Sequence, residues 1–578
     1  MTQQPPAPVT AIVGLGSVGE ALLHLLHRAG HRVVAVDTDL DVLARAAGRL
    51  KAVTSGGPEG PEVVFTPDHT AVRDAGLVVE AVPDDAAAKA DALARIVAAC
   101  PPGTPLVTTT ASLSVARLAV ATGRPADVAS LRFFTPPAPG GPVEPVATSL
   151  TSPATAAAVD ALVASAGLEP VEVGARPAAD ADALMLAHLN RAVVLLATGY
   201  ATHQDIDTAL RLGCGLPAGP LETLDRIGLD TAHRALTDLW RRTGDSAFEP
   251  APLLSRMVAD GRLGHKSGEG FYTYDETGAV RDRTARAPGA GGARTVRRVG
   301  VVGSGAMARG IAEITAAAGC PTVLVARSVD KAERALDAIA DSLARAVRRG
   351  RTTDRAARST RGLLRGADDV TALADCDLVV EAVVEDLDVK RELFAELGAV
   401  CAPGAVLATT TSSLSVAACA EASGRQADVV GLHFFNPAPV MRLVELVHTD
   451  TVGQEALATA RAFCQVLGKT AVECPDRTGF IVNSLLFPYL GAAVALLDRP
   501  DTGIKETDTA VQRGYGHPMG PFALLDTIGL DVSAAIQQRL YESFLTPEYE
   551  PAAALAELVA AGLLGRKNGR GLRTAAHR

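Results

Sequence analysis

One stretch of the chain contains residue types suited to proton transfer: His433 in HFFNP, Glu445 in LVELV, Ser412 in TTTSSLS and Asn483 in FIVNS. Histidine ionises near neutral pH and is therefore the usual side chain for moving a proton in catalysis. A carboxylate can orient the imidazole ring, and hydroxyl and amide groups can stabilise charge on a reacting oxygen. Each residue alone has a plainer explanation, such as a buried histidine or an asparagine that caps a helix. The chemical interpretation therefore depends on all four together.

A glycine-rich turn near the start of the chain predicts dinucleotide binding. Gly14, Gly16 and Gly19 follow the G-x-G-x-x-G pattern, and Asp37 ends the next apolar run. Such glycines let the backbone approach a pyrophosphate at a helix N-terminus, and the acid can bind the ribose hydroxyls. This turn favours NAD. A scaffold that kept the turn but binds nothing is the alternative.

A second turn of the same kind lies past the middle of the chain, with Gly303, Gly305 and Ala308 at the three positions. Alanine is allowed at the third position because that residue governs helix–strand packing. Ala326 replaces the acid of the first turn and is followed by Arg327. Loss of the carboxylate removes repulsion against a 2′-phosphate, and an arginine can pair with one. The second turn therefore favours NADP, and a solvated charge at a strand end is the alternative for Arg327.

The two turns belong to an internal duplication. VVEAV begins at Val78 and again at Val379, and LGHKSGEG at Leu263 corresponds to LGRKNGRG at Leu564, both with an offset of 301 residues. The turns at 14 and 303 differ by 289 residues, so the first copy is 12 residues shorter after its second apolar run. Each copy opens with strand-like runs and an amphipathic segment and continues with long helical stretches. The predicted fold is α/β, with two tandem copies of a Rossmann-type doubly wound domain, each followed by an all-helical domain.

This repeat sets the expected domain boundaries. Dinucleotide-binding domains are expected at 1–180 and 297–481, helical domains at 181–282 and 482–578, and a linker rich in Gly, Ala and Arg at 283–296. The net charge of −10 disfavours nucleic acid and anionic membranes as partners. The eight cysteines show no CxxC pair and no metal-type spacing with histidine, so no metal is expected. Without a signal-like start or an apolar run of roughly 20 residues, we expect a cytoplasmic protein.

The segments TTTSSLS, GLHFFNPAPVMRLVELV and DRTGFIVNSLL resemble signature segments of the (S)-3-hydroxyacyl-CoA and 3-hydroxybutyryl-CoA dehydrogenases, and the resemblance covers nearly the whole chain, once per half. It implies reversible NAD(P)-dependent oxidation of an (S)-3-hydroxyacyl-CoA, with a short acyl chain, by the second half. Carried over by position, it implies that His433 is the general base and Glu445 its partner. It further implies that Ser412 and Asn483 hydrogen-bond the reacting oxygen or its neighbours.

The same resemblance implies residues for the cofactor and for CoA. Glu385 and Lys390, in VVEDLDVK, match family residues beside the cofactor. In the family, a helical insertion after the second strand helps to hold CoA. The second copy keeps this insertion, and its candidates for the CoA phosphates are Arg348, Arg349 and Arg351. A solvated arginine-rich helix is the alternative.

The first copy has lost most of the reactive set. Ala111, Arg132 and Asp182 stand at the positions of the serine, histidine and asparagine, and Glu144 keeps the glutamate. Arginine stays protonated at neutral pH and cannot act as a base, so we predict a catalytically silent copy in which Arg132 pairs with Glu144.

Two roles remain open for the silent copy: an intrachain pseudo-dimer with the second copy through the helical domains, or sensing of NAD(H). Further homo-oligomerisation is also open. Two alternatives remain for the whole chain. One is a reductase of a non-CoA or carrier-protein-bound hydroxy acid, and the other is a non-catalytic dinucleotide-binding regulator.

Overall fold

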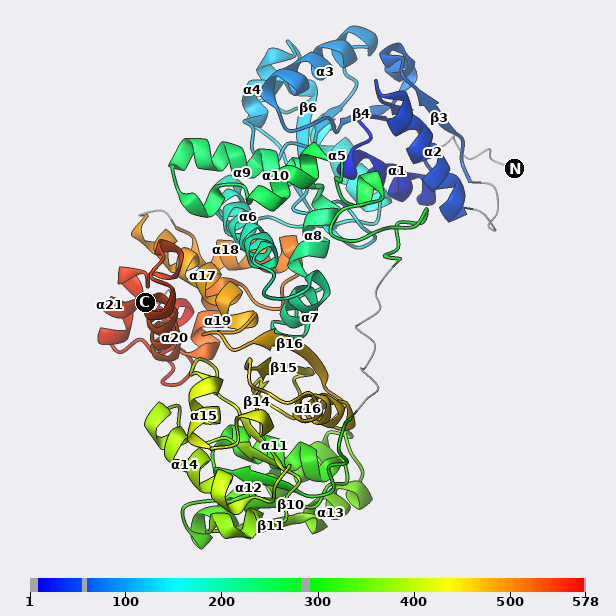
Figure 1. Ribbon diagram of the computed structural model, residues 1–578. Helices are drawn as coiled ribbons and strands as arrows, with labels where there is room; N and C mark the ends of the chain where they lie inside the picture. Colours follow the sequence, from blue (N-terminus) through cyan, green and yellow to red (C-terminus); the bar gives the residue numbers. More distant parts are fainter. Residues whose placement is uncertain (1–8, 55–59, 282–291, 500–501, 576–578) are drawn as a thin grey trace.

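The computed structural model describes residues 9–54, 60–281, 292–499 and 502–575 (Figure 1). Of the expected linker at 283–296, residues 283–291 lie outside the described residues. Figure 1 shows an α/β unit at each end of the molecule, with helices from both halves gathered between them. The two halves therefore meet through their helical parts.

Each α/β unit contains an eight-stranded sheet, with orders β3-β2-β1-β4-β5-β6-β7-β8 and β11-β10-β9-β12-β13-β14-β15-β16. The strands are parallel except at the antiparallel pairs β6–β7 and β14–β15. The order 3-2-1-4-5-6 is that of the Rossmann fold, so the predicted fold class is confirmed. The first sheet consists of β1 (Val9–Val13), β2 (Arg32–Val36), β3 (Val63–Thr66), β4 (Leu77–Glu80), β5 (Leu106–Thr108), β6 (Val128–Arg132), β7 (Pro142–Val146) and β8 (Glu169–Pro170). The second consists of β9 (Val299–Val302), β10 (Thr322–Val325), β11 (Leu364–Ala367), β12 (Leu378–Glu381), β13 (Val406–Thr409), β14 (Val429–Phe434), β15 (Leu443–His448) and β16 (Thr470–Pro475).

The central strands are apolar because helices cover both faces of each sheet. β4 and β12 have the same sequence, LVVE, and every residue in both is buried. The helices of the first half are α1 (Ser17–Arg28), α2 (Leu40–Thr54), α3 (Ala86–Ala99), α4 (Val115–Ala121), α5 (Pro153–Ser165), α6 (Ala175–Ala197), α7 (His203–Gly213), α8 (Pro220–Ile227), α9 (Leu229–Thr243) and α10 (Pro252–Ala259). Those of the second half are α11 (Ala306–Ala317), α12 (Val329–Arg348), α13 (Asp354–Gly362), α14 (Leu387–Val400), α15 (Val416–Ala422), α16 (Gln454–Val466), α17 (Val482–Ala495), α18 (Ile504–Thr509), α19 (Pro521–Ile528), α20 (Leu530–Phe544), α21 (Ala553–Ala560) and α22 (Leu572–Ala575).

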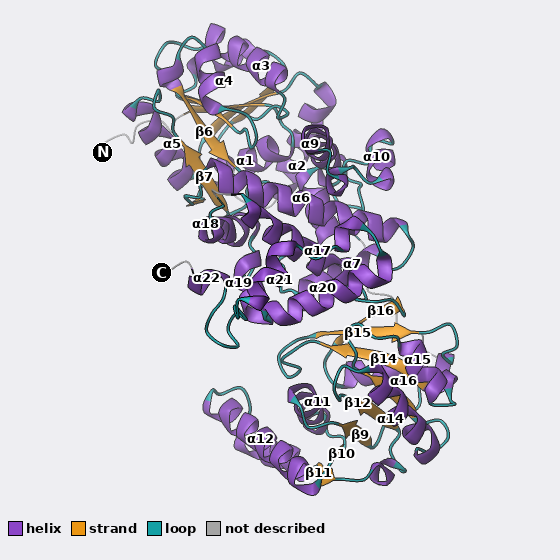
Figure 2. Ribbon diagram, turned by 90° about the vertical axis from the view of Figure 1, so that its left-hand side faces the viewer, coloured by secondary structure: helices purple, strands orange, loops and turns teal. Residues whose placement is uncertain are grey.

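The halves differ most after the second strand of each sheet. The second half continues with α12 and α13, whereas the first half has the single helix α2 before β3. Figure 2 shows α12 on the outer side of the second α/β unit. The 12-residue difference between the copies thus accounts for one helix of this arm.

The two helical parts share a core. Helix α6 of the first half packs against α17 of the second. Leu184 and Met185 of α6 lie in one buried cluster with Phe487 and Leu490 of α17. Burying a large apolar side chain stabilises a fold by roughly 1.5–3 kcal/mol, so these contacts join the halves firmly.

Each half also covers the sheet of the other. Helix α7 of the first half packs against β15 and β16, and a π-helical turn at Ala510–Gly514 in the second half packs against β7. Arg499 forms an ion pair with Asp180 across the interface, with a 2.9 Å N–O distance. Within the described ranges, no helix is long and apolar enough to cross a membrane.

Candidate active site

His433 and Glu445 face each other on neighbouring strands. Antiparallel pairing of β14 with β15 sets the two residues directly opposite, where Cβ atoms lie about 5 Å apart. The Nδ1 atom of His433 is 2.6 Å from Oε2 of Glu445. The two residues are 5% and 0% exposed. The segments HFFNP and LVELV thus build a buried imidazole–carboxylate pair.

Backbone groups hold Glu445 in one orientation. Its Oε1 accepts hydrogen bonds from the backbone N–H of Ile481, at 3.0 Å, and of Val482, at 2.8 Å. Since the carboxylate accepts from Nδ1 of His433, the ring carries a proton there and Nε2 can accept another. Ser412 Oγ lies 3.0 Å from Nε2. A proton taken up at Nε2 would give an imidazolium that the Glu445 carboxylate stabilises.

Two aromatic rings enclose the imidazole. The centroids of Phe435 and Phe480 lie 4.6 Å and 5.5 Å from that of His433. Phe480 is buried and has φ of +48°, in the left-handed region. This conformation costs roughly 1–2 kcal/mol in a residue with a Cβ. It occurs in the loop 476–481, the same loop whose end donates hydrogen bonds to Glu445.

Asn483 is the second residue of α17, directly after Val482. It is 8% exposed, and the described residues provide no hydrogen-bond partner for its side-chain amide. Its amide atoms are not sealed off from solvent, so the amide is available to a ligand. The structure thus brings His433, Glu445 and Ser412 into contact and leaves the Asn483 amide free beside the loop that holds Glu445.

Glu385 organises the serine-rich segment. It accepts hydrogen bonds from Thr411 Oγ1, at 2.6 Å, and from the backbone N–H of Ser412, at 2.9 Å. Burial alone would raise the pKa of Glu385, but the ammonium of Lys390 and these hydrogen bonds outweigh it and hold the pKa below its usual value. Glu385 therefore stays ionised and fixes the backbone that carries Ser412.

Lys390 is buried among carboxylates. Its Nζ lies 2.7 Å from Glu381 Oε1 and 3.4 Å from Glu385 Oε2. The first half repeats the central pair, with Lys89 Nζ 2.9 Å from Glu80 Oε1. Both halves thus have this ion pair, although the first half has Arg132 in place of His433.

The turn between β9 and α11 fits a pyrophosphate. Gly303 has φ of +131°, and a Cβ there would lie 2.4 Å from the carbonyl oxygen of Ala382. A Cβ on Gly305 would meet no described atom within 4 Å, so the start of α11 faces open space. Ala308 is buried, as helix–strand packing requires. A helix N-terminus with free N–H groups and room in front of it is a suitable anion site.

The turn of the first half has the same shape. Gly14 has φ of +96°, a Cβ on Gly16 would meet no described atom within 4 Å, and a Cβ on Gly19 would lie 1.9 Å from the Gly14 carbonyl oxygen. Asp37 Oδ2 accepts a hydrogen bond of 2.8 Å from the backbone N–H of Leu15. The acid is therefore held against the turn, where ribose hydroxyls are bound in such folds.

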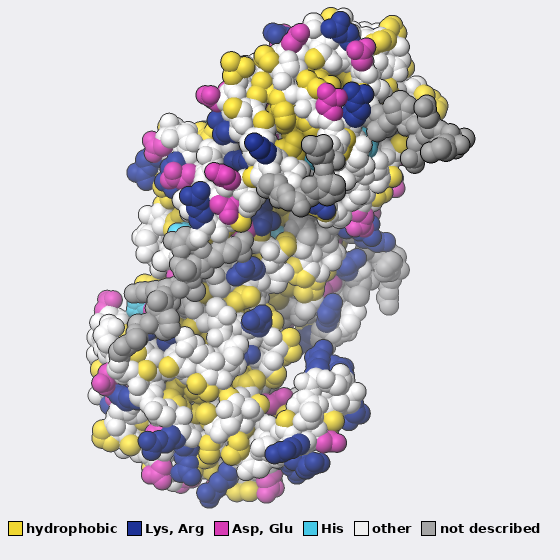
Figure 3. All heavy atoms as spheres, turned by 90° about the vertical axis from the view of Figure 1, so that its right-hand side faces the viewer, with side chains coloured by type: hydrophobic (Ala, Val, Ile, Leu, Met, Phe, Trp, Pro, Cys, Tyr) yellow, Lys and Arg dark blue, Asp and Glu magenta, His cyan; other side chains and the backbone are white. Residues whose placement is uncertain are grey.

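In the second half the equivalent strand end carries no acid. Ala326 is buried, whereas Arg327 is exposed and forms no ion pair within the described part of the chain. The three arginines of the arm, Arg348, Arg349 and Arg351, are also exposed, at the C-terminal end of α12. Figure 3 shows Lys and Arg side chains gathered over the second α/β unit. The described contacts do not connect these arginines to His433.

The site of the first half is arranged differently. Arg132 Nη1 lies 2.8 Å from Glu144 Oε2, so the predicted pair is confirmed. Glu144 Oε1 accepts from the backbone N–H groups of Val173 and Gly174, ahead of α6. Asp182 accepts a 2.7 Å hydrogen bond from the hydroxyl of Tyr515 in the other half, and burial raises its pKa to about 6. Ala111 has no side-chain group for proton transfer, and Arg132 cannot act as a base.

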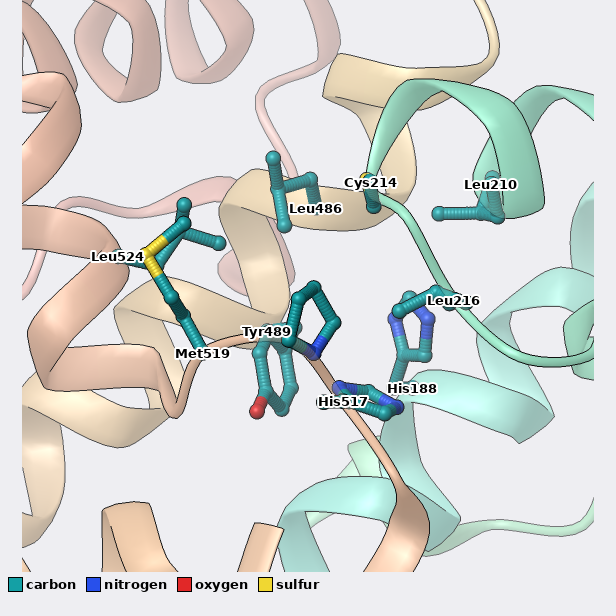
Figure 4. Close-up of a pocket in the computed structure, with 10 residues that line it drawn as sticks. His188, Leu210, Cys214, Leu216, Leu486, Tyr489, His517, Met519 and Leu524 are labelled. Atoms are coloured by element: carbon teal, nitrogen blue, oxygen red, sulfur yellow. The ribbon is translucent and has the colours of Figure 1, made fainter. Parts of the chain in front are cut away.

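A small cavity of about 30 Å³ lies between the helical parts of the two halves (Figure 4). This is room for one or two water molecules. Burial lowers the pKa of His188 to about 4 and that of His517 to about 3, so both rings are neutral at pH 7. The lining residues are His188, Leu210, Cys214, Leu216, Leu486, Tyr489, His517, Pro518, Met519 and Leu524. Ser412, His433, Glu445 and Asn483 are not among them.

The sequence motifs do not indicate every residue of the site. Arg539 of α20 donates a 2.8 Å hydrogen bond to Ser413 Oγ, and no motif indicates it. Phe480 and Thr411 lie inside the quoted signature segments, so their position in the motifs was the available signal. In the described part of the chain, no group of three or more His, Cys, Asp or Glu side chains could hold a metal ion.

Two family models match the chain twice each. The NAD-binding domain of 3-hydroxyacyl-CoA dehydrogenase matches residues 9–176 and 298–477, and the C-terminal domain of the same family matches 181–274 and 479–575. The 3-hydroxybutyryl-CoA dehydrogenase of Mycobacterium tuberculosis is 44% identical over 281 residues, covering 48% of this chain and 98% of the relative. The mitochondrial hydroxyacyl-coenzyme A dehydrogenase of Rattus norvegicus is 39% identical over 285 residues, covering 48% and 90%.

One solved structure shares the fold over most of this chain. The 3-hydroxybutyryl-CoA dehydrogenase of Escherichia coli K12 matches with a TM-score of 0.55, over 96% of this chain and 99% of that one. At 21% identity this likeness concerns the fold. With both domain models matched in each half, the chain belongs to the 3-hydroxyacyl-CoA dehydrogenase family and is an NAD(P)-dependent oxidoreductase duplicated in tandem.

Proposed function

We propose that the second half interconverts (S)-3-hydroxyacyl-CoA and 3-oxoacyl-CoA, with short chains such as 3-hydroxybutyryl-CoA as substrates. The observation that carries this proposal is the hydrogen-bonded series Ser412–His433–Glu445. The first half has no counterpart to it, since Ala111 and Arg132 occupy the equivalent positions.

The reaction assigns one task to each residue. A dinucleotide with its pyrophosphate at the second glycine turn would supply or accept the hydride through its nicotinamide ring. In oxidation His433 Nε2 takes the proton of the 3-hydroxyl while the C3 carbon loses its hydrogen with the electron pair and the C3 carbonyl forms. Glu445 stabilises the resulting imidazolium. Ser412 and the amide of Asn483 donate hydrogen bonds to the reacting oxygen. In reduction protonated His433 returns the proton.

Binding of the nucleotide and of CoA falls to separate surfaces. Gly303, Gly305 and Ala308 would hold the pyrophosphate, and Glu385 would lie beside the cofactor with Lys390 behind it in the ion pair. The exposed Arg327, without an acid at position 326, favours NADP in the second half. The glycine turn and Asp37 favour NAD in the first half. Arg348, Arg349 and Arg351 are the proposed contacts for the CoA phosphates.

For the first half we propose a role as partner of the second. The shared core of α6 and α17 supports an intrachain pseudo-dimer. Loss of the base and the serine supports a copy that does not itself catalyse the reaction.

The direct test is the initial rate of acetoacetyl-CoA reduction by the full chain, with NADH and NADPH in parallel. His433→Ala should abolish the rate, and the matched change Arg132→Ala in the first half should leave it unaltered. A rate that survives His433→Ala, or that disappears in an Arg132→Ala variant that still folds, contradicts the assignment. Activity toward acetoacetyl thioesters that lack the CoA nucleotide would instead favour a non-CoA or carrier-bound substrate.

A further inference from the structure

The end of helix α7, in the first half, touches the surroundings of His433. A Cβ on Gly213, the last residue of α7, would lie 2.9 Å from Leu443 Cδ2, 3.1 Å from Val482 Cγ2 and 3.5 Å from the ring of Phe435. The Cδ2 atom of Leu443 ends a flexible side chain and can shift to admit a Cβ. A larger, branched side chain at residue 213 would also press on Val482 and Phe435 in this close-packed interior. The helix can therefore approach this closely because residue 213 has no side chain.

The residues that lie next to Gly213 are themselves direct neighbours of His433 and Glu445. Val482 donates its backbone N–H to Glu445 at 2.8 Å. The ring of Phe435 packs edge-on against the imidazole of His433. Leu443 begins β15, the strand that carries Glu445. A displacement at Gly213 would therefore reach both members of the pair.

Tyr200, just before α7, holds the adjoining loop. Its hydroxyl donates a 3.0 Å hydrogen bond to the carbonyl of Pro475, at the end of β16. The guanidinium of Arg477 lies over the Tyr200 ring, 5.2 Å from its centroid. Both contacts lie where β16 passes into the loop 476–481, which contains the strained Phe480. The last residue of this loop, Ile481, and the first residue of α17, Val482, donate their N–H groups to Glu445.

Two titratable groups of the first half at this contact, Cys214 and Tyr200, are uncharged. Burial and the nearby Glu445 raise the pKa of Cys214 to about 12, so this thiol is neutral. The phenol of Tyr200 is also neutral, because burial raises its pKa far above the usual range. Their contact with the second half is therefore one of shape, hydrogen bonding and the ring face that Tyr200 offers to Arg477.

We infer that Gly213 and Tyr200 are positioning residues for His433 and Glu445, so that the first half completes an active site to which it contributes no reacting group. This inference rests on the function proposed for the second half. The first half can position these residues of the second half although Arg132 replaces its own histidine.

The internal repeat provides a matched control. Gly514 is equivalent to Gly213 by the 301-residue offset, and a Cβ there would lie 2.5 Å from the ring of Phe134, the equivalent of Phe435. The contact is of the same kind and lies in the same interface, but it borders the Arg132–Glu144 pair. Glu144 is held by Val173 and Gly174, and not by the loop equivalent to 476–481.

The experiment compares Gly213→Val with Gly514→Val in the full chain, using acetoacetyl-CoA and the preferred reduced cofactor. We expect kcat to fall about tenfold or more in Gly213→Val, because small misplacements of reacting groups are costly. The KM for the cofactor should stay within about twofold, since the glycine turn is elsewhere. Gly514→Val should keep kcat within about twofold, although it should lose at least as much thermal stability, because a Cβ there would lie within 3.0 Å of three atoms of the Phe134 ring. The milder Tyr200→Phe should lower kcat about threefold without a change of side-chain volume.

Two results would overturn the inference: a folded Gly213→Val with kcat close to that of the parent chain, or equal losses of kcat in the two glycine variants. If Gly213→Val does not fold, an unchanged kcat in Tyr200→Phe refutes the inference and a threefold loss supports it. The parent chain is assayed before any variant is made. If it does not reduce acetoacetyl-CoA, the proposed function itself is refuted.

Discussion

Replacing Glu445 by glutamine removes the charge opposite His433 and keeps the size of the side chain. The carboxylate accepts three hydrogen bonds, one from the imidazole and two from backbone N–H groups. An amide has one oxygen and one NH₂ group. If its oxygen accepts from Ile481 and Val482, its NH₂ group faces Nδ1 and favours the tautomer with the proton on Nε2. That tautomer cannot accept a proton from the 3-hydroxyl.

The size of the effect follows from the charge that develops on His433. In the parent chain an imidazolium forms next to a fully buried carboxylate. Two unit charges about 4 Å apart attract by about 4 kcal/mol at an effective dielectric constant of about 20. Because each 1.36 kcal/mol is a factor of ten in rate, loss of this attraction lowers kcat by about 10³-fold.

The assay is kcat for oxidation of (S)-3-hydroxybutyryl-CoA at saturating cofactor, because the charge on His433 develops in this direction. Glu144→Gln in the first half is the matched control, because Glu144 pairs with an arginine that does not change charge, and its kcat should equal that of the parent chain. A Glu445→Gln variant that folds and retains more than about one tenth of the parent kcat would refute the reasoning. Equal losses in the two variants would also refute it.

Four further outcomes are expected. Ala326→Asp should shift the kcat/KM ratio from NADPH toward NADH, because the carboxylate repels a 2′-phosphate; an unchanged ratio would separate this position from cofactor choice. Replacing Arg348, Arg349 and Arg351 together by alanine should raise the KM for acetoacetyl-CoA about tenfold at unchanged kcat, and an unaltered KM would mean that these arginines are solvated. Lys390→Met should destabilise the chain by about 3–5 kcal/mol in urea unfolding, since it leaves a buried carboxylate unpaired; a loss below about 1 kcal/mol would contradict this. The pKa of Glu385 lies below 4.5 in the folded chain, so its contribution to stability is present above that pH and is lost as the pH falls further. Glu385→Gln should therefore flatten the acid limb of the melting temperature measured against pH, and an identical limb would contradict the assigned shift.

Much of the architecture could be predicted because it is encoded locally or by repetition. Apolar runs, glycine turns and amphipathic stretches recur in both halves, with an offset of 289 residues at the glycine turns and of 301 residues from VVEAV onward. Loss of the base in the first copy was visible in the same way, since Arg132 occupies the position of His433. The family resemblance implies that Glu445 is the partner of His433. In the structure the two residues lie opposite each other on an antiparallel pair of strands.

Contacts between distant segments could not be predicted in this way. Lys390 was expected beside the cofactor from its motif, and the fold uses its ammonium in an ion pair with Glu381. Arg539 reaches the serine-rich segment from α20, and no spacing indicates that it does. Such contacts depend on how separate elements pack, and sequence patterns report only which face of an element is apolar.

By itself the sequence determined the repeat, the order of the elements, the family and the half that keeps a complete set of reactive side chains. The tertiary structure alone decided that the backbone of Ile481 and Val482 holds Glu445. It also decided that Gly213 packs against Val482, 269 positions away in the chain, and that Tyr200 contacts Pro475 and Arg477. The physical reason is that these are contacts of shape at close range. A glycine is common at the end of a helix, so its presence in the sequence does not indicate a tertiary contact. Only the folded structure shows that another segment packs against the space left by its missing side chain.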